Sequence, residues 1–206
     1  MPGGRRDAGR DGTTKQWQAS AQRNPSSREC RRADADGLNT MTAMTDPRIR
    51  MASPADLPDI LRLVHDLAEY EREPDAVEAT ENDFARVLFP DHGHPGTFCH
   101  VAEVDGKVVA IALWYLNFST WTGQQGIWLE DLFVEPKHRG SGLGKELLIT
   151  LANVCVDRGY RRLEWWVLNW NEPSIAFYES LGAKAQDEWT VYRVDGDELA
   201  TLGGAE

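Results

Sequence analysis

The sequence has no run of apolar residues long enough to cross a membrane, and it contains little cysteine. Across its 206 residues no window approaches about eighteen uninterrupted apolar side chains, so a transmembrane helix is not expected. The cysteines, Cys30, Cys99 and Cys155, are odd in number and lack the CxxC or Cys/His spacing of a zinc site. We therefore expect no disulfide framework, no bound metal and a reducing, cytoplasmic environment.

Basic residues are too few for a protein whose main partner is a nucleic acid. The chain carries 22 Lys and Arg against 33 Asp and Glu, a net charge of −11, whereas phosphate contacts require clustered basic side chains. The excess of acid lies in residues 44–206, which hold 14 basic and 28 acidic residues, whereas residues 1–43 hold 8 and 5. An acidic body attracts cationic ligands through its long-range field.

Apolar residues are abundant enough for a core, except at the N-terminus. Hydrophobic residues make up 41% of the chain, which excludes disorder throughout. The first 43 residues, however, are rich in Gly, Arg, Asp and Ser, have one aromatic residue and show no periodicity or secretory signal. We expect a disordered extension over residues 1–45, with a basic nucleic-acid-binding arm as the alternative, and one domain over residues 46–206.

From Arg48 onward the apolar pattern alternates between the periods of strands and helices. In chain order it predicts a strand at 49–51, a helix at 54–70 capped by Ser53, a helix after the Thr80–Asp83 capping box, strands at 98–103, 107–118 and 127–134, a helix from 143 ended by Gly159, a strand at 163–168, a helix at 173–180 and a strand at 189–194. This order is typical of an α/β or α+β sandwich, in which helices cover both faces of a mixed sheet.

A glycine-rich turn, Arg139-Gly-Ser-Gly-Leu-Gly144, joins the strand at 127–134 to the following helix. Glycines allow a tight turn that aims successive backbone N–H groups into a concavity, and the helix N-terminus adds partial positive charge. A phosphate or pyrophosphate is the natural ligand, and Arg139 supplies a charged contact. The G-x-G-x-G spacing matches neither the dinucleotide fingerprint nor the P-loop.

These residues resemble the GCN5-related N-acetyltransferase (GNAT) superfamily, whose acetyl-CoA motif is Q/R-x-x-G-x-G/A. Arg139, Gly142 and Gly144 fit that motif, and residues 127–134 and 170–183 look like the diamine (spermidine/spermine) acetyltransferase subgroup. The resemblance covers roughly residues 47–194. It implies a GNAT fold with a central mixed, mostly antiparallel twisted sheet of six to seven strands, helices on both faces, and a homodimer.

The resemblance also assigns roles that the chemistry requires. Because an alkylamine has a pKa near ~10, acetyl transfer needs a base, and Glu130 stands at that position. The departing CoA thiolate needs a proton, and Tyr178 stands where the family places the acid. The residues implied to bind acetyl-CoA are Leu132, Phe133, Val134, Arg139, Gly140, Ser141, Gly142, Leu143, Gly144, Lys145, Asn171, Ser174 and Tyr178.

Each role has a purely structural alternative. Glu130 and Asp131 are adjacent, so on a regular strand their side chains point to opposite faces and one of them is a solvated charge. Tyr178 lies in an expected helix, where a tyrosine is often part of the core. The tryptophans at 165, 166 and 170 line either an amine pocket or the core. Cys99 has no activating neighbour and reads as a buried strand residue, and the five histidines read as surface or loop residues.

The resemblance places Tyr70 and Glu71 beside Glu130 and Asp131, in a carboxylate-lined slot for a second cationic nitrogen. Ser119 stands where polyamine-acetylating members carry aspartate, and the Ser-Thr-Trp form looks more like the thialysine-acetylating branch. The expected reaction is direct acetyl transfer, in a ternary complex, to a primary amine of a thialysine-like amino acid, diamine or polyamine. A protein-lysine or N-terminal acetyltransferase and a non-catalytic acetyl-CoA-binding module are the alternatives.

Overall fold

The computed structural model describes residues 46–204, which form an α/β structure around one sheet. Its five strands lie in the order β1-β2-β3-β4-β5 and are β1 (Ile49–Met51), β2 (Thr97–Val104), β3 (Lys107–Ser119), β4 (Gln124–Val134) and β5 (Leu163–Glu164). Neighbouring strands are antiparallel except β4 and β5, which are parallel. The predicted mixed, mostly antiparallel sheet is thus confirmed, whereas the predictions for residues 1–45 lie outside the described residues.

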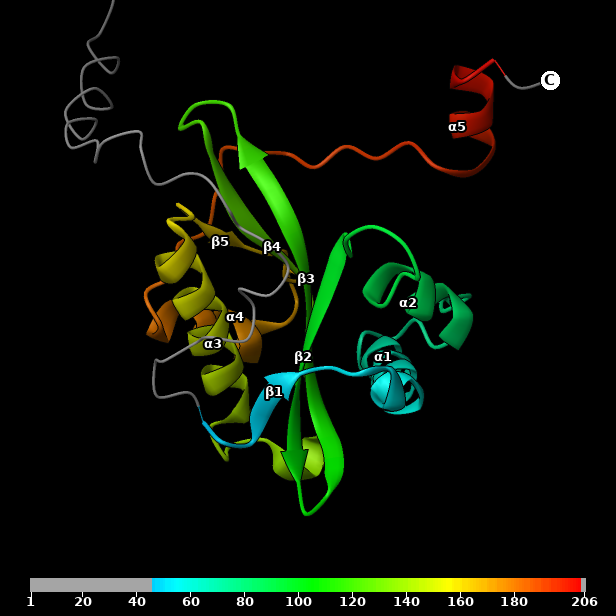
Figure 1. Cartoon of the computed structure of the whole chain (residues 1–206). Helices are drawn as coiled ribbons and strands as arrows, with labels where there is room; N and C mark the ends of the chain where they lie inside the picture. Colours follow the sequence, from blue (N-terminus) through cyan, green and yellow to red (C-terminus); the bar gives the residue numbers. More distant parts are fainter. Residues whose placement is uncertain (1–45, 205–206) are drawn as a thin grey trace, which may run out of the picture. The chain divides into compact units, whose positions relative to one another are not determined.

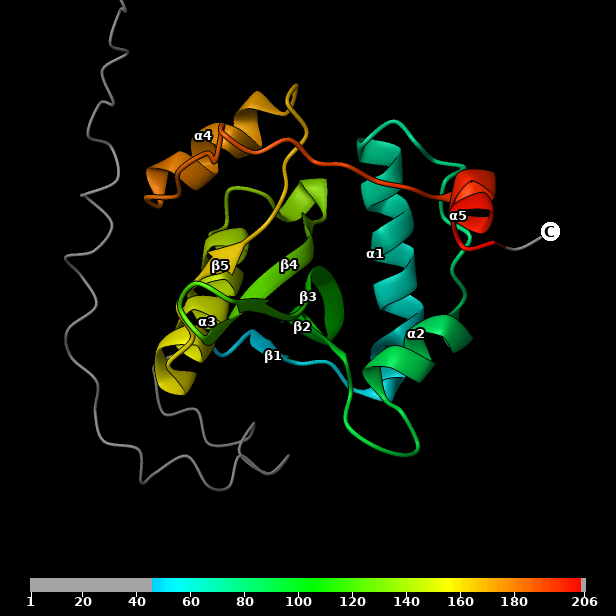
Figure 2. The same cartoon turned by 90° about the horizontal axis from the view of Figure 1, so that it is seen from above.

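Helices cover both faces of the sheet, as Figures 1 and 2 show. The helices α1 (Leu57–Tyr70) and α2 (Glu81–Leu88) lie on one side, and α3 (Leu143–Arg158) and α4 (Glu172–Ser180) lie on the other. The core on the α1 side consists of Ile60, Leu63, Leu88, Cys99, Val101, Val108, Ile111 and Phe133. Because burial raises the pKa of the Cys99 thiol, Cys99 is an inert core residue, as predicted.

The ends of these elements follow from local chemistry. Ser53 is the N-cap of the 3₁₀ turn η2 (Pro54–Asp56), which leads into α1, and Thr80 and Asp83 form the predicted capping box of α2. Asp105 and Gly106 both have positive φ, 52° and 76°, as a two-residue hairpin between β2 and β3 requires. No helix within the described residues is long and apolar enough to span a membrane.

The sheet has fewer strands than the six to seven predicted. The strand expected at 163–168 is only Leu163–Glu164, because the chain then leaves β4. The segment 189–194 is rich in the aromatic and β-branched residues typical of a strand, but it is exposed and pairs with no strand within residues 46–204. A short helix, α5 (Gly196–Leu202), follows it.

Candidate active site

The parallel strands β4 and β5 separate where the site begins. They pair at only two positions, Ile127–Leu163 and Trp128–Glu164. From residue 129 to residue 134 that edge of β4 has no strand partner among the described residues. Apart from the Val134 oxygen, which accepts a hydrogen bond from Arg139, its backbone groups are available to a ligand. This edge contains Leu132, Phe133 and Val134, the predicted contacts of the cofactor arm.

A β-bulge interrupts β4 at Glu130. On β3, Leu113 pairs with Asp131, but the next residue, Trp114, pairs with Leu129. Glu130 is therefore an additional residue on β4 with no counterpart on β3. Such a bulge breaks the alternation of side chains between the two faces of a sheet.

The bulge places two carboxylates on the same face of the sheet. Asp131 lies opposite Leu113, and Trp128 lies opposite Tyr115, two residues further along β3, so Asp131 and Trp128 share a face. Glu130 belongs to that face too, because Trp128 Nε1 donates a hydrogen bond to Glu130 Oε2 at 2.9 Å. The prediction that Glu130 and Asp131 point to opposite faces is therefore wrong, and the bulge is the reason.

The end of α1 brings a third carboxylate to these two. Burial, followed by the charges of Glu130 and Glu71, raises the pKa of Asp131 to about 6. Glu71, the residue after α1, is half-buried, and burial raises its pKa as well. We call Glu71, Glu130 and Asp131 the acidic cluster. Because a cation would relieve this crowding of negative charge, the cluster is suited to a protonated amine.

Tyr178 projects from α4 toward the same region. Burial, followed by the charges of Glu71 and Tyr70, raises the pKa of Tyr178 to about 12. The phenol therefore keeps its proton at neutral pH and is able to donate it. Its ring packs on Trp165 at a centroid distance of 4.9 Å, so its position is fixed by packing. The structure thus brings the predicted acid close to the acidic cluster.

The glycine-rich turn has the backbone geometry of an anion site. Gly140 and Gly142 have φ of 76° and 88°, values at which any other residue is strained. Gly142 is the N-cap of α3 and offers no side chain, so the first N–H groups of the helix, from Leu143 to Lys145, are left for a ligand. A Cβ added to Gly144 would make only ordinary contacts, the nearest at 3.7 Å, so the fold alone does not require glycine there.

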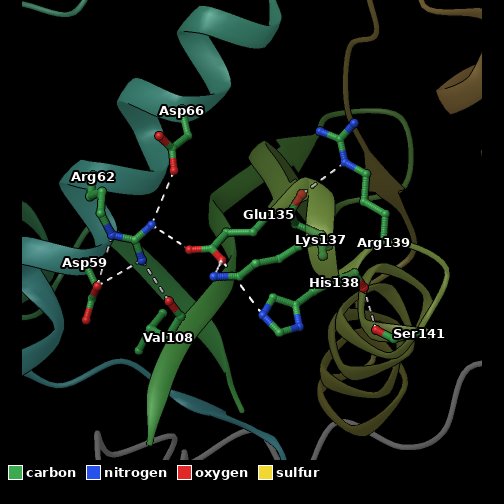
Figure 3. Close-up of polar contacts among 10 residues, drawn as sticks. Asp59, Arg62, Asp66, Val108, Glu135, Lys137, His138, Arg139 and Ser141 are labelled. Carbon is green, nitrogen blue, oxygen red and sulfur yellow. Dashed lines mark hydrogen bonds and ion pairs between the residues drawn. The ribbon is translucent and has the colours of Figure 1, made fainter. Parts of the chain in front are cut away.

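Polar contacts hold the start of this turn (Figure 3). Arg139 Nε donates to the backbone oxygen of Val134 at 3.1 Å, and Ser141 Oγ donates to that of His138 at 2.6 Å. The guanidinium of Arg139 also lies 4.6 Å from the ring centroid of Tyr70. Arg139 is thereby held beside the N-terminus of α3, where both could contact the same phosphate.

Sequence reasoning missed an ion pair that ties α1 to this turn. Glu135, the residue after β4, is only 8% exposed, and its carboxylate lies 2.7 Å from Arg62 and 2.8 Å from Lys137 (Figure 3). Arg62 also donates to the backbone oxygen of Val108 at 2.9 Å. Burial alone would raise the pKa of Glu135, but the hydrogen bonds of Lys137 and Arg62 lower it below its usual value. Arg62 lies outside the apolar stripe of α1, on the polar side with Asp59 and Asp66, so no pattern in the sequence indicates this contact.

Asn171 and Ser174 occupy the start of α4. Asn171 is 6% exposed and caps the helix, with its Oδ1 accepting from the backbone N–H of Ser174 at 3.4 Å. The same oxygen accepts a hydrogen bond from Tyr70 Oη at 3.0 Å. The predicted cofactor residues of α4 are therefore joined to the end of α1, a contact that sequence spacing did not reveal.

Other candidates divide between the site and the core. Trp166 packs edge-on against Trp128 at 4.9 Å and is 58% exposed, so it lies beside the side chain that holds Glu130. His100 is 3% exposed and accepts a hydrogen bond from Trp114 Nε1 at 3.1 Å, so the prediction that all histidines are surface or loop residues is wrong. Burial lowers the pKa of His100 to about 4. In residues 46–204 no group of three or more potential metal ligands was found.

Comparisons with known proteins identify the family of the chain. The model of the acetyltransferase (GNAT) family matches residues 59–183. The thialysine N-epsilon-acetyltransferase of Bos taurus is 36% identical over 167 residues, covering 76% of this chain and 96% of that protein. The L-ornithine N5-acetyltransferase of Arabidopsis thaliana is 28% identical over 198 residues, covering 75% and 87%.

A solved structure shows the same fold. An integron cassette protein from the mobile metagenome of V. cholerae has a TM-score of 0.64 and 27% identity, covering 75% of this chain and 96% of its own. With the family match, these relatives confirm the resemblance to thialysine and spermidine/spermine acetyltransferases. The chain belongs to the acetyltransferase (GNAT) family and is an acetyl-CoA-dependent N-acetyltransferase.

Proposed function

We propose that the enzyme acetylates a primary amine of a small molecule that carries a second polar or cationic group, such as a thialysine-like amino acid, a diamine or a polyamine. The observation that carries the proposal is the acidic cluster of Glu71, Glu130 and Asp131, which the bulge of β4 assembles near Tyr178. Relatives named for thialysine, at 33–36% identity, support an amino-acid-like acceptor.

In the proposed mechanism, the chain's own groups hold acetyl-CoA and move two protons. The N–H groups at the start of α3 and the Arg139 guanidinium bind the pyrophosphate, and the free edge of β4 binds the pantetheine arm. Glu130, directly or through water, removes a proton from the ammonium group. The free amine forms a bond to the thioester carbonyl carbon. The C–S bond then breaks as the nitrogen loses its second proton to water, which leaves the amide, and Tyr178 protonates the thiolate. Exchange of protons with solvent then restores both residues.

We also propose that the enzyme acts as a homodimer. The segment after α4 exposes Trp189 by 70%, Tyr192 by 90% and Leu202 by 75%, although these residues are suited to burial. A strand-like segment without a strand partner in its own described chain is able to pair with a second copy. Sedimentation equilibrium should therefore give twice the chain mass, and a monomer at micromolar concentration would contradict this proposal.

Thiol release from acetyl-CoA tests the proposed function. Spermidine, putrescine, thialysine, lysine and a lysine-containing peptide are compared at equal concentration. We expect one small amine to be clearly preferred, and Tyr178→Phe to lower the turnover of that amine at least about tenfold with little change in acetyl-CoA affinity, because the proton donor is lost. Activity on the peptide alone would replace this proposal with protein acetylation.

A further inference from the structure

Tyr70 contacts both elements that are proposed to hold acetyl-CoA. It is the last residue of α1, and its Oη donates to Asn171 Oδ1 at 3.0 Å, at the N-cap of α4. The guanidinium of Arg139, from the glycine-rich turn, lies over its ring at 4.6 Å. One side chain therefore links the two parts of the cofactor site, with Asn171 lying 101 residues and Arg139 lying 69 residues after Tyr70 in the sequence.

The contacts of Tyr70 leave few of its groups for an amine. Its hydroxyl proton is used by Asn171, which is 6% exposed, and one ring face is occupied by Arg139. The half-buried ring also packs against the core on the α1 side. Stacking on a ring leaves the in-plane N–H groups of a guanidinium free, so Arg139 keeps the donors that a phosphate requires.

A second contact between the end of α1 and the start of α4 lies next to the hydrogen bond of Tyr70 with Asn171. Arg72 has a φ of 69°, which residues other than glycine rarely adopt, and its guanidinium lies 4.4 Å from the ring centroid of Trp170. The Trp170 ring in turn lies 6.0 Å from that of Tyr70. The end of α1 thus holds the turn before α4 at two adjacent points.

The same helix also holds the end of β4, four residues before the glycine-rich turn begins. Arg62, eight residues before Tyr70 and so ~12 Å from it along the helix axis, pairs with the buried Glu135 at 2.7 Å (Figure 3). The end of β4, the glycine-rich turn and α4 therefore all contact the same rigid helix, α1. Displacing the end of α1 would move Arg139 and Asn171 relative to each other.

We propose that Tyr70 is a positioning residue for acetyl-CoA, fixing the Arg139 guanidinium and the Asn171 amide in their binding arrangement before the cofactor arrives. This inference rests on the proposed function and replaces the prediction that Tyr70 binds the amine. Tyr70 acts through other residues, so its loss should weaken cofactor binding even when no amine is present.

Calorimetric titration with acetyl-CoA, without amine, tests this inference. Tyr70→Phe keeps the ring under Arg139 and loses the hydrogen bond, so we expect Kd to rise about three- to tenfold. Tyr70→Leu loses both contacts, and we expect a larger rise, about thirtyfold or more. Tyr160→Phe is the matched control, because Tyr160 follows the far end of α3, ~24 Å along that helix from the glycine-rich turn, and its Kd should stay within about twofold of wild type.

The amine KM at saturating acetyl-CoA separates positioning from substrate contact. For Tyr70→Phe we expect this KM to stay within about twofold of wild type. An unchanged Kd for acetyl-CoA together with a raised amine KM would overturn the inference and leave the proposed function intact. Wild-type protein that fails to bind acetyl-CoA would instead overturn the proposed function.

A double-variant comparison guards against a general loss of structure. In the Asn171→Ala background the hydrogen bond is already gone, so adding Tyr70→Phe should leave the Kd for acetyl-CoA unchanged. Thermal unfolding confirms that each variant folds. Fully additive losses in the two single variants would overturn the inference, because the two side chains would then act independently.

Discussion

At Glu130 and Asp131, one additional residue in a strand changes what two adjacent carboxylates are able to do. The bulge turns both toward the end of α1, where Glu71 adds a third negative charge, and the pKa of Asp131 rises to about 6. An arrangement of this kind lowers the stability of the folded chain and favours a cationic ligand. The cost to stability and the gain for binding are therefore measurable at the same side chain.

Asp131→Asn should stabilise the folded protein at neutral pH. Between the ordinary pKa of 3.8 and the folded value of about 6, the folded state holds a proton that the unfolded state has lost, so stability falls as pH rises through this window. Above pH ~6 the penalty is complete, and removing the charge should raise the free energy of unfolding by about 1–2 kcal/mol at pH 7.5.

Thermal unfolding at pH 7.5 and pH 4.5 checks this expectation. The gain from Asp131→Asn should be clear at the higher pH and small at the lower, where wild-type Asp131 is already protonated. The exposed Asp157 on α3 provides the control, since Asp157→Asn should change little at either pH. Equal gains at both pH values would show that the charge of Asp131 is not the cause.

At the scale of elements, patterns within a segment were predictable, whereas pairings between segments were not. The apolar stripe of α1, the Thr80–Asp83 capping box of α2 and the Asp105-Gly106 turn lie in the local sequence, and the structure confirms them. The bulge depends on how β4 meets β3, and the length of β5 depends on where it leaves β4. The segment 189–194 has the composition of a strand but lacks the partner that makes one.

The same distinction applies to the site. The glycine-rich turn was visible because its spacing is local, and the positive φ of Gly140 and Gly142 explains that spacing. Two contacts join residues that lie far apart in the sequence: the ion pair of Arg62 with Glu135, 73 positions apart, and the hydrogen bond of Tyr70 with Asn171, 101 positions apart. No local sequence pattern indicates either contact. The family resemblance indicates which positions have a function but not which residues contact each other, and from it Tyr70 is predicted to bind the amine.

The Arg62–Glu135 pair should stabilise the contact between α1 and the glycine-rich turn. Arg62→Met leaves the buried Glu135 carboxylate with Lys137 at 2.8 Å and the His138 imidazole at 3.9 Å, and we expect a loss of about 1–3 kcal/mol in the free energy of unfolding. Adding Glu135→Gln removes the poorly compensated charge and should recover part of that loss.

Urea denaturation measures both effects. Arg86→Met is the control, because Arg86 is 75% exposed in its pair with Asp83. Apart from any effect on the capping box to which Asp83 belongs, its loss should lower the free energy of unfolding by no more than about 0.5 kcal/mol. If the double variant is less stable than Arg62→Met by the full cost of a separate Glu135→Gln substitution, the two side chains do not stabilise each other.

At the scale of the whole molecule, charge and site agree. Residues 44–206 carry 28 acidic against 14 basic side chains, a field that concentrates cationic amines near the chain, and the acidic cluster provides the local destination. The glycine-rich turn and Arg139 provide a local positive site for the anionic cofactor within this acidic body. The two substrates of opposite charge thus have separate binding elements, the acidic cluster for the amine and the glycine-rich turn for the cofactor.

The pH dependence of thiol release by wild type and Glu130→Gln tests most directly whether this site performs base-assisted acetyl transfer to an amine. Without the carboxylate, the rate should follow the fraction of free amine, so kcat/KM of Glu130→Gln should keep rising toward pH ~9.5 after the wild-type value has levelled off. Glu103→Gln, on β2 and outside the site, should retain the wild-type profile. Profiles for Glu130→Gln and wild type that superimpose after scaling would contradict the account.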